Sequence, residues 1–208
     1  MRIEIKPYDS EWTHDFQKIK TEIAEILSPL NPVIEHIGST SVPGLAAKPV
    51  IDMVVGLKHY DDLDKTIAPM IAHSYIYYEV FNSAMPERRL YVKLKDSAHL
   101  KLFKSRYTEN DTLPHDEINT LRLAHVHIWE HGTSEWIRHI AFRDYLRMHP
   151  IVCEEYGELK TTLSKRAWKH GMEYNDGKND FIKIVQAKAV KWYHDQRNEF
   201  NPVFITES

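Results

Sequence analysis

The sequence predicts an α/β fold, in which a small mixed sheet with flanking helices precedes a C-terminal helical region. Apolar residues between Trp12 and Leu27 recur at steps of three and four, which indicates an amphipathic helix. Short runs rich in β-branched and aromatic residues follow, and the spacing becomes helical again in the last third. We therefore expect a single domain over residues 1–208, with the sheet within about residues 1–130 and a helical cap over about residues 134–196.

The first elements follow from their start and stop signals. Asp9 and Ser10 offer a helix N-cap, and Pro29 favours the end of this helix at the residue before it. Residues 33–37 are β-prone. Residues 49–57 form a strongly apolar run, which we expect to be a central strand.

The rest of the chain shows less regular patterns of apolar residues. Pro69 can kink or stop the helix that we expect around it, and the segment at about residues 96–122 is the hardest to assign. In order, we expect a helix over residues 61–73, strands over 75–78, 89–94 and 99–103, a loop over 108–119, a strand over 124–129, and helices beginning near residues 134, 150 and 178.

Composition narrows the class of protein. A formal net charge of -3 gives no strong signal for nucleic acid, and no apolar run is long enough to cross a bilayer. Cys153 is the single cysteine, so an internal disulfide is excluded. The N-terminus has no signal-peptide core, and we expect a cytoplasmic protein with no membrane partner.

A glycine- and hydroxyl-rich loop has the composition of an anion site. Gly38 lets the backbone approach a phosphate, and the amides and hydroxyls of Ser39, Thr40 and Ser41 can donate to it. Lys48 supplies a compensating charge. The alternative is an ordinary turn between two elements.

Asp52 lies on the apolar strand that follows this loop. A carboxylate on a rigid strand can hold a divalent metal, Mg or Mn, that bridges phosphate groups. The alternative is an aspartate that caps a nearby backbone group.

His125 and His127 are two apart on an expected strand, so their side chains share a face. Two imidazoles on one face can bind a transition metal or contact phosphates. The alternative is a pair of histidines that form hydrogen bonds within a half-buried sheet.

The segment from His36 to Asp52 resembles the hallmark of the GrpB-like family and, more broadly, the nucleotidyltransferase superfamily signature. The resemblance extends in order through nearly the whole chain, and about residues 96–122 look like an insertion or a divergent segment. The matching blocks are residues 36–52, 86–89, 125–128, 136, 141–147, 156–160, 174–178 and 181–182. The resemblance implies a nucleotidyltransferase-like mixed sheet and a similarity to a domain fused to dephospho-CoA kinase in some bacteria. It assigns no reaction.

The matching blocks also single out basic residues. We expect Arg88, Lys93, Arg143 and Lys178 to contact phosphate, while Arg143 and Asp144 can alternatively form an internal pair.

One position departs from the superfamily signature. The residue two after Asp52 is acidic in that signature and is Val54 here. Three interpretations follow: the protein uses one metal, another side chain completes the site, or catalysis is lost and ligand binding is kept.

The leading hypothesis is a nucleotidyltransferase-like enzyme that acts on a nucleotide or another phosphorylated small molecule. Gly38 and Ser39 would hold the phosphates, Asp52 would hold Mg or Mn, and Asp52 and His127 would be catalytic. The first alternative is a non-catalytic nucleotide or phospho-metabolite binding module on the same fold. The second is a histidine-based, metal-dependent hydrolase with Asp52, His125 and His127 as ligands.

Overall fold

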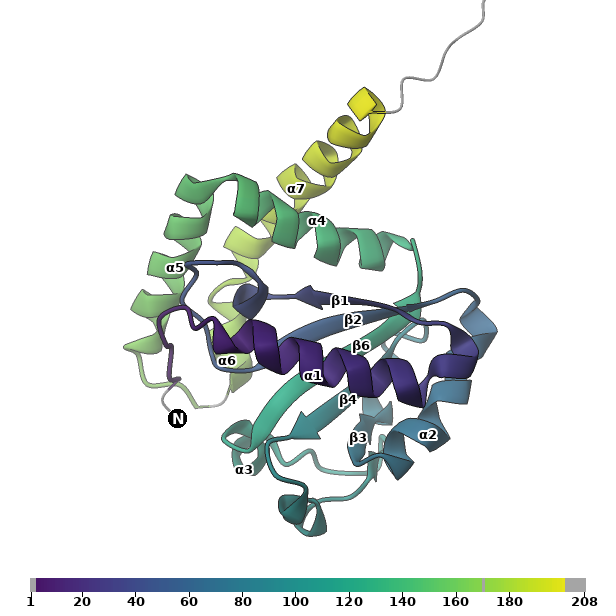
Figure 1. Ribbon diagram of the computed structural model, residues 1–208. Helices are drawn as coiled ribbons and strands as arrows, with labels where there is room; N and C mark the ends of the chain where they lie inside the picture. The colour runs from purple at the N-terminus through teal and green to yellow at the C-terminus, as the bar shows by residue number, and fades with distance from the viewer. Residues whose placement is uncertain (1–2, 170, 201–208) are drawn as a thin grey trace, which may run out of the picture.

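The computed structural model describes residues 3–169 and 171–200, and these form a six-stranded mixed sheet with helices on both faces (Figure 1). The strand order is β1-β2-β6-β4-β3-β5. Pairs β2–β6 and β3–β5 are parallel and the others antiparallel. The strands are β1 (Val33–Ile37), β2 (Ile51–Leu57), β3 (Tyr75–Tyr78), β4 (Arg89–Leu94), β5 (Arg106–Tyr107) and β6 (Arg122–Glu130). The α/β fold class is confirmed.

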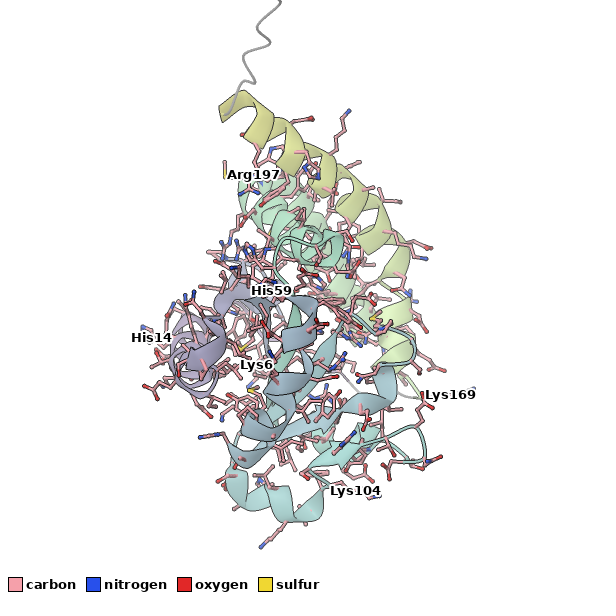
Figure 2. All side chains as sticks on the ribbon, turned by 90° about the vertical axis from the view of Figure 1, so that its right-hand side faces the viewer. Lys6, His14, His59, Lys104, Lys169 and Arg197 are labelled. Atoms are coloured by element: carbon pink, nitrogen blue, oxygen red, sulfur yellow. The ribbon has the colours of Figure 1, made fainter. Side chains whose placement is uncertain are left out.

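The described helices lie before, between and after the strands. They are α1 (Glu11–Ile26), α2 (Ile67–Ala72), α3 (His115–Asn119), α4 (Ser134–Met148), α5 (Pro150–Ser164), α6 (Gly171–Asp176) and α7 (Asn179–Phe200). The far end of α7, which carries Arg197, projects away from the body of the molecule (Figure 2). None of the helices in the described part of the chain is long and apolar enough to span a membrane.

Helix α1 covers one face of the sheet because its apolar stripe is continuous. Trp12, Phe16, Ile19 and Ile23 are buried in the main core cluster. The carboxylate of Asp9 accepts the backbone N–H of Glu11 at 3.0 Å and satisfies one of the first-turn donors. The helix ends before Pro29, as expected.

The two faces of β2 and β6 differ in character. Met53 and Val55 on β2 and Val126 on β6 are fully buried beneath α1 and α2. The opposite face carries Asp52 and His125, which are direct partners in the β2–β6 register. The side chains that point to this second face build the site described below.

Two separate layers cover that second face. Residues of α4 and α7 pack on Val54 and Trp129 at one end. The segment from Phe103 to Leu121 packs on Val92 and its neighbours at the other end. Asp52 and His125 lie between the two covers and remain partly exposed.

Three expected elements are wrong. Residues 99–103 are not a strand but belong to a 3-10 helix, Ser97–Leu102, because the Asp96 carboxylate caps the N–H of Ala98 at 2.8 Å. The expected loop over 108–119 contains α3. The expected helix over 61–73 is broken into short 3-10 turns before α2.

Candidate anion-binding site

The loop between β1 and β2 turns at a glycine that no other residue can replace easily. Gly38 has φ +69°, and a Cβ atom there would lie 2.6 Å from Oδ2 of Asp52. The hydroxyl of Ser41 donates to the carbonyl of Gly38 at 2.6 Å and closes the turn. Ser41 therefore holds the loop rather than facing the cavity.

Thr40 and His36 brace the same loop from behind. Nε2 of His36 and the Thr40 hydroxyl are 3.0 Å apart, and the hydroxyl donates to the Val50 carbonyl at 3.4 Å. The His36 ring stacks on Phe16 at 4.6 Å. Burial lowers the pKa of His36 to about 4, with the Asp52 charge opposing that effect, so this ring is neutral at pH 7.

Asp52 belongs to a hydrogen-bonded chain that fixes its charge. A guanidinium can only donate, so Arg122 Nη1 donates to His125 Nε2 at 2.7 Å. The proton of this imidazole therefore lies on Nδ1, which donates to Asp52 Oδ1 at 2.9 Å. Burial would raise the pKa of Asp52, but the His125 hydrogen bond and nearby positive charges outweigh it, and the pKa lies below its usual value.

These groups open onto a cavity of about 240 Å³ in which positive charge dominates. Lys48, Arg122, Lys160 and Lys178 line it, and Asp52 is the one carboxylate among the described lining residues. Ser39 and Thr40 also reach it. We call this cavity the lysine pocket. Its charge suits an anion.

Two of its lysines are held at an unusual pKa. Lys160, from α5, is 2% exposed, donates to the carbonyl of Ala46 and lies 4.5 Å from the Tyr156 ring centroid. Burial, reinforced by the charge of Lys178, lowers its pKa to about 7. Burial likewise lowers the pKa of Lys178 to about 8, although Asp52 opposes the shift. An anion would favour the charged form of both.

A larger groove of about 1060 Å³ lies elsewhere, along α5. Arg147 and Lys165 line it together with Glu154 and Glu158, so its charges balance. Cys153 also lines it, and burial raises the pKa of this thiol. Of these two cavities, the lysine pocket is the one in which basic side chains outnumber acidic ones, and we place the candidate site there.

The structure places three expected contacts outside this pocket. Lys93 points to the opposite face of the sheet, where it pairs with Glu22 at 2.6 Å. Arg143 donates to Glu35 at 2.6 Å and also pairs with Asp144, so it ties α4 to β1. Arg88 lies 5.9 Å from the Trp129 ring centroid, farther along the Asp52 face.

The two histidines of β6 differ in what they offer. Both ring nitrogens of His125 are engaged, by Asp52 and by Arg122. His127 is two residues farther along, and its buried Nδ1 has no hydrogen-bond partner among the described residues. Their ring centroids are 6.3 Å apart. The pair therefore does not present two free nitrogens for one metal ion.

A two-metal centre does not fit the donor set. Val54 occupies the position of the second carboxylate and is fully buried in an apolar cluster with Trp129 and Trp136. The described residues contain no group of three or more histidine, cysteine or acidic side chains placed to hold a metal. Four basic side chains also line the cavity that Asp52 lines, and their charge would repel a second cation.

Sequence reasoning did not select two of the four basic residues that line the pocket, Lys160 and Arg122. Lys160 follows Tyr156 by four residues and precedes Leu163 by three, so helical periodicity already placed this lysine on the buried face of α5. Arg122 left no such signal. An irregularity in the β4–β6 register next to Leu94 lets its side chain reach His125.

Comparison with known proteins places the chain in a family. The sequence profile of the family described as GrpB protein matches residues 2–188. The chain belongs to the GrpB family. The crystal structure of GrpB from Enterococcus faecalis is 30% identical, has a TM-score of 0.72 and covers 91% of this chain and 99% of that one.

Curated relatives extend the comparison. UPF0157 protein YqkA of Bacillus subtilis is 29% identical over 197 residues, which is 95% of this chain and 50% of YqkA. This chain thus spans half the length of that relative. Dephospho-CoA kinase of Mycobacterium tuberculosis is 24% identical over 89% of this chain and 46% of its own length. The Cid1 poly(U) polymerase matches with a TM-score of 0.44 and 8% identity, too distant to bear on activity.

Proposed function

We propose that this GrpB-family protein binds a nucleotide or another phosphorylated small molecule in the lysine pocket. The observation that carries the proposal is the convergence of Lys48, Arg122, Lys160 and Lys178 on a cavity with one carboxylate. Buried charges normally have partners, and a phosphate would supply partners for these.

The backbone of the pocket also suits a phosphate. Gly38 removes side-chain bulk beside Asp52, and the turn that follows it brings Ser39 and Thr40 to the lining of the cavity. Lys160 from α5 and Lys178, directly before α7, would meet groups from β2 and β6 across the ligand. Ligand binding would then join the sheet to the helical region.

The second candidate is transfer of a nucleotidyl or phosphoryl group with one Mg²⁺ or Mn²⁺ that arrives with the nucleotide. The observation that favours it is Oδ2 of Asp52, which faces the Gly38 turn and has no hydrogen-bond partner among the described residues. A bound ion would offset phosphate charge. Because the two-metal arrangement does not fit, this candidate depends on a single ion.

Thermal unfolding with ATP and with tripolyphosphate, each in EDTA and then in Mg²⁺, tests both candidates. A ligand at about 100 times its Kd stabilises by about 2.7 kcal/mol, which raises the Tm of a chain of this size by about 5 °C or more. We expect that rise in EDTA. We expect Lys178→Met to abolish it and Lys58→Met, at an exposed lysine outside the pocket, to keep it.

The outcomes separate the candidates. A rise that requires Mg²⁺ and disappears in Asp52→Asn would support the second one. No rise with either anion, or an equal rise in Lys178→Met, would overturn the proposed binding site.

A further inference from the structure

A second cavity adjoins the lysine pocket. It measures about 510 Å³, and Lys48, Val50 and Arg122 line both cavities. These three residues therefore border both cavities. A ligand that is held by its phosphates in the lysine pocket has room to continue past this border into the second cavity.

The lining of the second cavity differs from that of the first. Ile3, Pro49 and Val50 give it an apolar side, while Asn119 and Thr120 at the end of α3 add polar groups. Lys95 and Lys169 are exposed at the cavity, and Glu4 is its one acidic lining residue among those described. An apolar wall with a few polar groups suits a flat ring with hydrogen-bonding edges.

The volumes of the two cavities suit different parts of one ligand. Cavities that hold small organic ligands usually measure about 300–1,000 Å³. The lysine pocket, at about 240 Å³, falls below that range and suits phosphate groups alone, whereas the neighbouring 510 Å³ falls within it. Arg122 links the two cavities, because it donates to His125 in one and to Asn119 in the other.

We propose that the cavity between Val50 and Thr120 binds the nucleoside part of a nucleotide whose phosphates occupy the lysine pocket. The inference rests on the proposed phosphate site and adds the chemical class of the rest of the ligand. Base and sugar pack on Ile3, Pro49 and Val50. Lys48 and Arg122 contact the phosphate nearest the sugar.

Titration calorimetry of ATP and tripolyphosphate tests this inference, because the two probes share a triphosphate and differ by the nucleoside. We expect ATP to bind about tenfold more tightly, since the nucleoside removes apolar surface from water. Thr120→Trp fills the cavity from its exposed rim and should remove that difference while tripolyphosphate binding is kept. Thr112→Trp, at an exposed position on the same segment outside both cavities, should retain it.

A second variant fills the cavity from the opposite wall. Glu4→Trp replaces an exposed side chain and should also remove the ATP advantage, and far-UV circular dichroism verifies that each variant is folded. Equal affinity of the wild-type protein for both probes, or an ATP advantage that survives both tryptophan variants, would overturn the nucleoside site. If the wild-type protein binds neither probe, the phosphate site itself is overturned.

Discussion

The two faces of strand β2 perform different tasks with alternating residues. Met53 and Val55 are 0% exposed and pack beneath α1 and α2, whereas the Asp52 side chain, one residue away, is 34% exposed and touches a charged cavity. The first face contributes burial of apolar surface to stability. The second contributes charge at a cost in desolvation.

The polar face exists because two covers leave a space between them. The α4–α7 layer buries Val54 and Trp129, and the 103–121 segment buries Val92. Asp52 and His125 remain partly exposed. The candidate site thus lies where the packing of the two covers ends. The following substitutions test the difference between the two faces.

The largest effect is expected from a charge on the apolar face. Met53→Asp buries a carboxylate without a partner and should cost about 4 kcal/mol or more, enough to prevent folding. Asp52→Asn, next to it, should change the free energy of unfolding by about 1–2 kcal/mol. Urea unfolding followed by circular dichroism measures both. A folded Met53→Asp protein with a midpoint like that of wild type would contradict the comparison.

A smaller effect is expected where the loop approaches Asp52. Gly38→Ala should cost about 2–4 kcal/mol, because it combines backbone strain at positive φ with a contact that is too close. Gly44→Ala is the matched control, since Gly44 also has a positive φ, +80°, but no atom lies within 4 Å of its added Cβ. That control should cost about 1–2 kcal/mol. Equal losses would show that the Asp52 contact is unimportant.

The smallest effect concerns the pH dependence of the lysine pocket. Sulfate stays a dianion across this range, while Lys160 and Lys178 lose their protons as the pH rises through about 7 and about 8. Sulfate affinity should therefore fall about tenfold between pH 6.5 and 9, measured by calorimetry. Lys160→Met should bind weakly already at pH 6.5, and Lys58→Met should keep the wild-type profile. A flat profile in wild type would contradict the charged-lysine pocket.

The same lysines determine whether the free energy of unfolding rises or falls with pH. Their folded-state pKa values lie below the usual value, so the unfolded chain binds more protons between about pH 7 and pH 10. The free energy of unfolding should rise with pH over that window. Lys160→Met should reduce this rise and should be at least as stable as wild type at pH 7.

Much of the framework could be predicted from local pattern. The stripe of α1, the apolar run of β2 and the pairing of His125 with His127 on one face depend on neighbours within a few residues. The turn at Gly38 was also expected from composition, and it is present. Its role as a phosphate site stays a prediction.

Other features could not be predicted because alternation defines two faces of a strand without saying what covers each. Arg89, Tyr91 and Lys93 alternate with apolar neighbours, yet this pattern does not reveal that Lys93 faces Glu22 and the core side. The 3-10 helix over Ser97–Leu102 depended on one capping carboxylate.

Sequence by itself determined α1, β2 and β6, the family block from His36 to Asp52, and the carboxylate missing at Val54. Tertiary structure alone decided that Lys160 and Arg122 meet Asp52 in one cavity. The physical reason is that the spacing of apolar residues along the chain indicates which side chains are buried. Which charged side chains meet in one cavity depends instead on segments that are far apart in sequence and packed together in space.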